Sequence, residues 1–168
     1  TSGIGRATAA LFAEEGAAVA FTGRSDERGQ EVVGGIEAKG GLALFIQADV
    51  RSSEDCYRSV SETLAAFGRL DILFNNAGTY VPNDALECSE EEWDSQVDTS
   101  LKGTFLMSKL ALPGMIAQGS GSIVNNASGW GLVGGEQAVA YCAGMCWPCR
   151  ASGARPPSSR RGCDRSAG

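Results

Sequence analysis

Histidine is absent from this sequence of 168 residues. It is the usual general base of catalytic triads and a common ligand of zinc and other metals. Its absence therefore excludes triads and metal sites that depend on histidine. With one cysteine-based exception near the carboxyl terminus, the sequence predicts no metal site.

Long hydrophobic runs are also absent. No window reaches 18 uninterrupted apolar residues, so neither a membrane-spanning helix nor a membrane partner is expected. No signal peptide is recognisable, but the sequence opens without methionine and inside a motif, so a targeting segment could precede Thr1. The six cysteines are expected to be reduced thiols in a cytoplasmic protein.

The composition fits one soluble globular domain, because 168 residues with 43% hydrophobic and 20% charged residues can bury a sizeable core. The net charge of −6 is unevenly distributed. Residues 1–148 contain nine Lys/Arg and nineteen Asp/Glu, whereas residues 149–168 contain five Arg and one Asp. An acidic body argues against a nucleic-acid-binding surface.

Two kinds of segment alternate along the chain. Short apolar runs that favour buried strands lie at Ala17–Thr22, Leu42–Ala48, Leu70–Phe74 and Ile123–Val124. Helix-favouring segments lie at Ala7–Gly16, Asp26–Lys39, Ser52–Gly68 and Ser89–Gln118. Ser52 or Ser53 is a predicted helix cap, and Ser89 with Glu92 forms a predicted capping box. This order predicts an α/β fold with a parallel sheet, helices on both faces and a first strand preceding Thr1.

Glycines precede the first helix. Gly3-Ile4-Gly5 would let a phosphate approach the backbone N–H groups at the positive end of that helix. The alternative is an ordinary pair of loop glycines. Small polar residues also follow a predicted strand, at Asn75-Asn76-Ala77-Gly78. Open α/β sheets bind ligands at the carboxyl ends of their strands.

Two charged residues follow the next strands. Arg24 comes just after the first apolar run, where an acidic residue would hold a ribose 2′-hydroxyl and a cation suits a 2′-phosphate. A solvated arginine in a turn is the alternative. Asp49, after Leu42–Ala48, could reach an adenine amino group, or could simply be a turn aspartate.

Ser128 and Tyr141 are candidate catalytic residues. Ser128 follows the last apolar run, and Tyr141 lies thirteen residues later in the first turn of a predicted helix. A strand and the helix after it pack side by side, so a hydroxyl that fixes a carbonyl and a phenol that moves a proton can share one pocket. A cation one helical turn beyond the phenol would lower its pKa from about 10, but that position is Met145.

The carboxyl-terminal stretch differs in character. Residues 146–168 are rich in Arg, Pro and Cys, and Pro148 is expected to end the preceding helix. The predicted division is therefore a domain over residues 1–145 and an irregular segment over 146–168. Three interpretations are open: a disordered basic tail, a zinc site, or the product of a reading-frame shift. The zinc ligands would be Cys142, Cys146, Cys149 and Cys163.

Several motifs together carry a family resemblance. They are Thr1–Arg6 (TSGIGR), Asp49-Val50, Asn75–Gly78 (NNAG), Trp93-Asp94, Leu101–Phe105 (LKGTF), and Ser122–Asn125 leading to Ser128 and Tyr141. In this order and spacing the chain, from Thr1 to about Gly144, resembles the short-chain dehydrogenases/reductases. The resemblance is greatest to their bacterial oxoacyl-carrier-protein reductase and glucose dehydrogenase branch.

The resemblance implies a Rossmann-type doubly wound fold that is incomplete in its first and last strands. It implies NAD or NADP as cofactor, with NADP favoured by Arg24, a small carbonyl or alcohol substrate and a homo-oligomer. Tyr141 would be the general acid/base, Ser128 would orient the substrate oxygen, and Ser100 would stand where the family has a catalytic asparagine. The matching cofactor positions are Ser2, Gly3, Ile4, Gly5, Arg24, Asp49, Val50, Asn75, Ala77 and Gly78.

Met145 departs from the family pattern, since a lysine is expected four residues after Tyr141. Two hypotheses follow. The chain derives from an NAD(P)-dependent oxidoreductase that transfers hydride, or it is a catalytically inactive module that binds a nucleotide or a partner.

Overall fold

The computed structural model describes residues 2–150, and side chains as far as residue 146. Its elements in chain order are α1 (Gly3–Glu14), β1 (Ala18–Gly23), α2 (Asp26–Glu37), β2 (Leu42–Gln47), α3 (Ser53–Phe67), β3 (Ile72–Asn75), α4 (Glu90–Val97), a π-helical segment η1 (Asp98–Lys102), α5 (Gly103–Gln118), β4 (Ser122–Asn125), a 3₁₀ turn η2 (Gly129–Gly131) and α6 (Val139–Arg150). The predicted α/β class is confirmed, and every paired strand in this part of the chain is parallel.

The strands form two separate pairs rather than one continuous sheet. β1 pairs with β2 in the register Ala18 to Leu42, and β3 pairs with β4 in the register Ile72 to Ser122. Within residues 2–150 the two pairs share no ladder of hydrogen bonds. β1 and β3 therefore each present an edge of unpaired backbone groups. The sequence predicted a single sheet that includes a strand before Thr1. The described residues form two two-stranded parts instead, β1 with β2 and β3 with β4.

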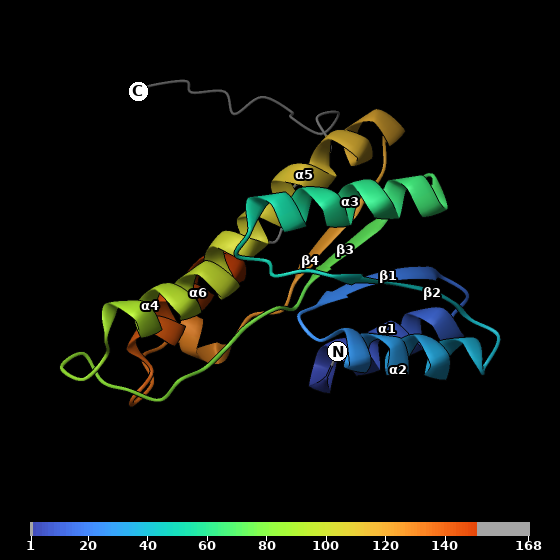
Figure 1. Ribbon diagram of the computed structural model, residues 1–168. Helices are drawn as coiled ribbons and strands as arrows, with labels where there is room; N and C mark the ends of the chain where they lie inside the picture. The colour runs from blue at the N-terminus through green and yellow to red at the C-terminus, as the bar shows by residue number, and fades with distance from the viewer. Residues whose placement is uncertain (1, 151–168) are drawn as a thin grey trace, which may run out of the picture.

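Helices cover both faces of the strands, as expected for a doubly wound fold. Figure 1 shows α1 and α2 below β1 and β2, with α3 and α5 on the opposite side. One core cluster joins α1, β1 and α2, and the other lies between β3 and α5. The buried members are Ala9, Ala13, Val19, Val32 and Ile36 in the first cluster and Leu73, Ala111 and Met115 in the second.

The helix boundaries follow local capping chemistry. Ser52 accepts a hydrogen bond from the Asp55 backbone N–H at the start of α3, and Ser89 forms a complete capping box with Glu92 at the start of α4. Both predicted caps are confirmed. Gly68 ends α3 with φ of 75°, a left-handed conformation that glycine adopts without steric cost.

A π-helical segment interrupts the long predicted helix over Ser89–Gln118. The Gly103 N–H bonds to the Asp98 carbonyl, five residues back. The hydroxyls of Thr99 and Thr104 donate to carbonyls four residues earlier, each at 2.7 Å, and such bonds compete with the helical ladder and bend it. α5 then continues through Pro113 to Gln118. The helix is continuous as predicted, but the sequence did not reveal η1.

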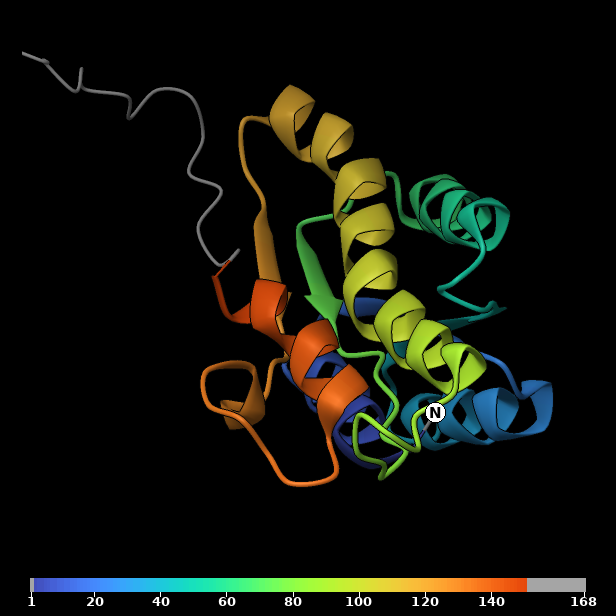
Figure 2. The same ribbon diagram turned by 90° about the vertical axis from the view of Figure 1, so that its left-hand side faces the viewer.

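α6 packs against α4, η1 and η2 and lies beside the long helix in Figure 2. It continues to Arg150, so the expectation that Pro148 ends this helix is wrong. A proline removes one backbone hydrogen bond, and the first turns of α6 remain held by packing on α4. Residues 151–168 of the predicted irregular segment lie outside the described part of the chain. No helix among the described residues combines the length and apolar character needed to span a membrane.

We predict opposite effects for two glycine substitutions in α2. A Cβ at Gly29 would lie 2.4 Å from the Phe45 ring, whereas one at Gly34 would meet no atom within 4 Å. Gly29→Ala should lower the free energy of unfolding by about 1–3 kcal/mol through overpacking. Gly34→Ala should raise it by up to about 1 kcal/mol through helix propensity. Urea unfolding measures both, and destabilisation of equal size by the two variants would contradict this packing.

Candidate active site

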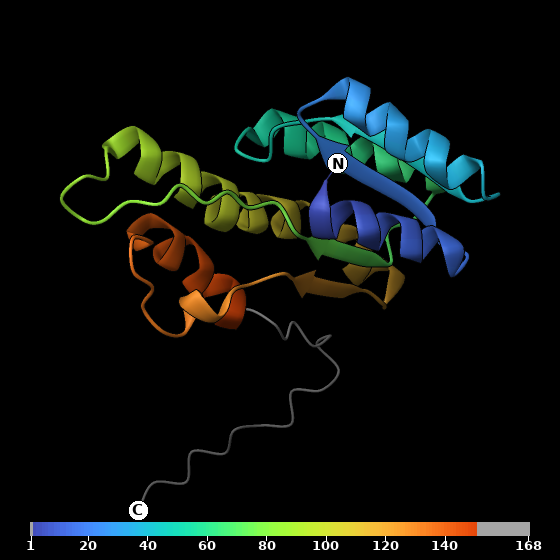
Figure 3. The same ribbon diagram turned by 90° about the horizontal axis from the view of Figure 1, so that it is seen from below.

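The amino end of α1 lies beside the carboxyl end of β3, as Figure 3 shows from below. Ser2 is the N-cap residue, and Gly3 has φ of 51° and begins the helix. The sequence placed the glycines in a loop before Ala7, but they form the first helical turn. That turn contains no acidic side chain and Ile4 is exposed, so the positive end of α1 is left uncompensated and can attract an anion.

Gly5 permits the close approach between α1 and the strand end. A Cβ at this position would lie 2.8 Å from Nδ2 of Asn76, closer than carbon and nitrogen atoms normally approach. Asn126 Nδ2 donates to Asn76 Oδ1 at 2.9 Å. Asn76 therefore links α1 to the segment after β4, a role that the sequence did not assign to it.

Asn75 is buried at the end of β3. Its Nδ2 donates to Ser108 Oγ at 3.1 Å and to Asn125 Oδ1 at 2.9 Å. The side chain thus joins β3 to β4 and α5. Asn75 was predicted to bind the cofactor, but its side chain is used to connect these elements. Ala77 and Gly78, which follow it, are exposed.

Gly78, Ser100 and Met145 form a close group beneath this edge. A Cβ at Gly78 would lie 3.2 Å from Met145 Cε and 3.7 Å from Ser100 Oγ. Met145 is 5% exposed and Ser100 is 2% exposed. Among the described residues the Ser100 hydroxyl has no hydrogen-bond partner. The hydroxyl of the candidate residue Ser100 is therefore a buried polar group without a partner, and the apolar Met145 side chain lies near it.

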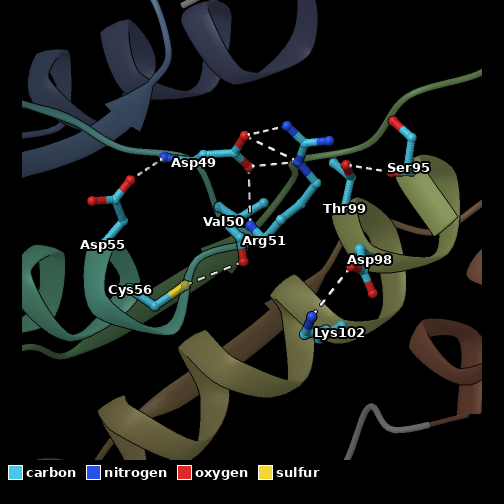
Figure 4. Close-up of polar contacts among 9 residues, drawn as sticks. All are labelled: Asp49, Val50, Arg51, Asp55, Cys56, Ser95, Asp98, Thr99 and Lys102. Atoms are coloured by element: carbon cyan, nitrogen blue, oxygen red, sulfur yellow. Dashed lines mark hydrogen bonds and ion pairs between the residues drawn. The ribbon is translucent and has the colours of Figure 1, made fainter. Parts of the chain in front are cut away.

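Asp49 lies after β2 and is held by Arg51 (Figure 4). Nε of Arg51 donates to both carboxylate oxygens of Asp49, at 3.1 and 3.0 Å, and Nη2 donates to Oδ2 at 2.6 Å. These side-chain hydrogen bonds hold the pKa of the Asp49 carboxyl below its ordinary value. The sequence predicted Asp49 as an adenine contact but did not identify Arg51.

Arg24 and Val50 flank this carboxylate. The positive charge of Arg24 acts weakly in the same direction on the Asp49 pKa, so the two predicted cofactor positions lie in one neighbourhood. The Val50 carbonyl accepts a hydrogen bond from Cys56 Sγ at 3.3 Å, and a Cβ at Gly103 would lie 2.9 Å from Val50 Cγ2. Burial raises the pKa of the Cys56 thiol to about 11, which marks it as a structural residue.

Ser128 and Tyr141 are connected through Trp130. Ser128 caps η2, accepting a hydrogen bond from the Trp130 backbone N–H at 3.3 Å. The Trp130 ring then lies edge-on to the Tyr141 ring, with centroids 6.0 Å apart. Tyr80 also contacts both rings. The two predicted catalytic residues therefore belong to one small region, and Tyr80 and Trp130 are neighbours that sequence reasoning missed.

The described side chains include no group of three His, Cys, Asp or Glu residues that could hold a metal ion. The zinc interpretation also involves Cys149 and Cys163, whose side chains lie outside the described part. The described residues therefore do not test this interpretation.

Comparisons with known proteins show what this chain is similar to. A family model described as short chain dehydrogenase matches residues 1–144. An uncharacterized oxidoreductase of Thermotoga maritima is 45% identical over 140 residues, which cover 83% of this chain and 55% of that protein. The 3-oxoacyl-[acyl-carrier-protein] reductase of Staphylococcus aureus is 41% identical over 143 residues, covering 84% and 58%. The chain thus spans little more than half the length of these relatives.

A solved structure is similar as well. A metagenomic short-chain oxidoreductase in complex with NADP superposes with a TM-score of 0.83 at 33% identity, covering 89% of this chain and 67% of that one. This likeness supports the Rossmann-type fold of the described residues.

We predict that the pKa of Asp49 depends on Arg51. In Arg51→Met the Asp49 carboxyl should titrate at a higher pH than in the unchanged chain, as followed by carbon NMR of that carboxyl. Because the folded pKa is depressed, the pair stabilises the fold above the unfolded pKa of about 3.9. This contribution is lost as the pH falls through the folded pKa. The loss in Arg51→Met at pH 7 should be below about 1 kcal/mol, because the pair is partly exposed. Identical titration curves would contradict the assignment.

Proposed function

The chain belongs to the short-chain dehydrogenase family, and from that premise we propose that the whole protein is an NAD(P)-dependent oxidoreductase. It would transfer hydride between the nicotinamide and the carbon atom of a carbonyl or alcohol substrate. The observation that carries the proposal is the position of Tyr141 in the first turn of α6, against the turn that Ser128 caps. The name of the S. aureus relative, a reductase, supports the same reaction type.

Tyr141 is proposed as the general acid/base. In the reducing direction the hydride reaches the carbonyl carbon, and the phenol gives its proton to the carbonyl oxygen. In the oxidising direction the phenolate takes that proton back. Ser128 would hold the same oxygen by a hydrogen bond, and the Trp130 N–H fixes the position of its Oγ. Proton transfer from a positioned side chain is worth about 10²–10⁴ in rate.

The residues at the strand ends fit a dinucleotide. The uncompensated amino end of α1, from Ser2 to Gly5, would hold the pyrophosphate. Asp49 and Val50 would flank the adenine, and Arg24 would face the ribose. The backbone of Asn75, Ala77 and Gly78 would line the nicotinamide side. The cofactor supplies or accepts the hydride, and these residues only bind and orient it.

Met145 favours a second candidate function, a catalytically inactive module that binds a nucleotide or a partner. Its position is one helical turn beyond Tyr141, so it shares a face of α6 with the phenol. The thioether provides no charge to lower the phenol pKa and no donor for the unpartnered Ser100 hydroxyl.

A homo-oligomer is also part of the proposal, formed through the long helix of residues 90–118 and through α6. Trp93 and Phe105 are large apolar residues exposed on that long helix. A contiguous exposed apolar patch marks a protein interface, and in the proposed oligomer these two side chains would be part of one.

We predict that Met145→Lys raises kcat/KM for NADPH-dependent ketone reduction by about a hundredfold or more. The introduced ammonium would lie near the Ser100 hydroxyl, which can accept its hydrogen bond, and would favour the ionised phenol. The matched control is Met145→Leu, which keeps the volume and adds no charge. The pH dependence of kcat/KM should shift to lower pH only in the lysine variant.

Two results would count against these assignments. If Met145→Lys and Met145→Leu have the same activity and pH profile, the missing cation is not what limits this site. If the unchanged chain reduces ketones at rates typical of enzymes, about 10 s⁻¹, the inactive module is wrong and Met145 is compatible with catalysis.

Arg24 gives a separate prediction about cofactor choice. Arg24→Ala should weaken NADP⁺ binding about tenfold or more, because a charged hydrogen bond to the 2′-phosphate is lost. NAD⁺ lacks this phosphate, so its affinity should not change. Arg28→Ala, another exposed arginine one turn along the chain, is the control. Equal weakening of both cofactors, measured by calorimetry, would show that Arg24 does not contact the 2′-phosphate.

A further inference from the structure

Three aromatic rings meet at Tyr141 and form what we call the aromatic wall: Tyr80, Trp130 and Tyr141. Tyr80 and Tyr141 have centroids 5.3 Å apart, Tyr80 and Trp130 5.6 Å, and Trp130 and Tyr141 6.0 Å. The interplanar angles lie between 66° and 88°, the edge-to-face arrangement that aromatic pairs prefer. Each ring comes from a different segment, so the wall is a tertiary feature.

The wall is held in place by contacts of its own. The Tyr80 hydroxyl donates to the Gln137 carbonyl at 3.3 Å, and the Asn83 N–H donates to the same carbonyl at 2.9 Å. Gln137 has φ of 50°, the only non-glycine residue in the described part of the chain with a positive φ. Such a conformation persists only where surrounding contacts enforce it. Tyr80 is therefore fixed to the segment that leads into α6.

Trp130 is fixed in a similar way by Gly135. A Cβ at Gly135 would lie 2.7 Å from Cδ2 and 2.9 Å from Cε2 of the indole. The ring thus packs directly on the glycine backbone, which only a residue without a side chain allows. Trp130 and Tyr80 are still 39% and 43% exposed as residues, so a ligand beside Tyr141 can reach both.

The two segments that lead to the wall, residues 76–83 and 126–141, carry little charge. Residues 76–83 contain no charged side chain, and residues 126–141 contain only Glu136, which is exposed. Leu132 and Val133, which follow η2, are 70% and 65% exposed. A carboxylate or phosphate on the substrate would find no cation in these segments, and Glu136 would repel it. An apolar ring would instead find apolar contacts in each of them.

We propose that the substrate of this site is a small uncharged molecule with a flat apolar or aromatic group next to the reacting carbon, such as an aryl ketone or the corresponding alcohol. The proposal rests on the oxidoreductase function of Ser128 and Tyr141. The aromatic wall would hold the flat group while the carbonyl oxygen reaches those two side chains. Specificity would thus come from ring contacts and from the lack of a cation in residues 76–83 and 126–141.

The test compares acetophenone with benzoylformate, which share a phenyl ketone and differ by a methyl group and a carboxylate. Dissociation constants are measured on the full chain by ligand-observed NMR with NADP⁺ present, so that no turnover is needed. Acetophenone should bind about tenfold or more tightly than benzoylformate. Trp130→Ala and Tyr80→Ala should each weaken acetophenone about three- to tenfold, and should weaken benzoylformate too, because both ligands carry the phenyl ring that the wall would hold.

Two further variants sharpen the comparison. Tyr57→Ala removes an exposed tyrosine from α3 and should change neither affinity. Glu136→Lys adds a cation on an exposed residue and should strengthen benzoylformate binding several-fold. This surface substitution keeps the proposal testable even if a ring variant fails to fold.

The outcomes separate this proposal from the oxidoreductase function. Equal or tighter binding of benzoylformate, no binding of either ketone, or ring variants that behave like Tyr57→Ala would overturn the inference about substrate class. Selective binding of acetophenone supports it even if turnover with NADPH is absent, a result that would count against the reductase alone. Efficient turnover that prefers benzoylformate would support a reductase and remove the apolar substrate class.

Discussion

Helix packing, rather than a continuous sheet, holds the two strand pairs together within residues 2–150. On one face α3 contacts β1 and β2, α5 contacts β3 and β4, and the two helices pack on each other. On the other face the amino end of α1 meets the end of β3 through Gly5 and Asn76. The candidate cofactor residues come from both pairs, with Arg24 and Asp49 on one and Gly78 on the other. The geometry of a shared site therefore depends on these helix contacts.

The centre of the site combines precise packing with missing charge. Ser100 and Met145 both lie close to Gly78, where they would meet a Cβ, and the Ser100 hydroxyl lacks a partner among the described residues. A buried polar group without a hydrogen bond costs about 1–3 kcal/mol. The aromatic rings of Tyr80 and Trp130 contact Tyr141 edge to face and remain partly exposed. In the proposed mechanism these contacts would position a phenol and a flat ligand, whereas Met145 would supply no cation to activate that phenol.

Features coded by neighbouring residues were predictable from the sequence, whereas features made by distant residues were not. The caps at Ser52 and Ser89 and the order of helices and strands depend on local patterns, and the structure confirms them. The hydrogen bonds of the Asn75 side chain and the contacts of Tyr80 with Trp130 and Tyr141 join residues 33 to 61 positions apart, which no local pattern encodes. Two errors had local causes: the glycines before Ala7 were assigned to a loop, and Pro148 was expected to end α6.

A dinucleotide site formed by the strand ends and the amino end of α1 is the feature on which the proposed function depends. Isothermal titration calorimetry of the unchanged chain with NADP⁺ and NAD⁺ tests this site most directly, because binding needs neither Met145 nor a substrate. We expect saturable binding of at least one dinucleotide with one molecule per chain. No heat of binding to a chain that circular dichroism shows to be folded would contradict the assignment.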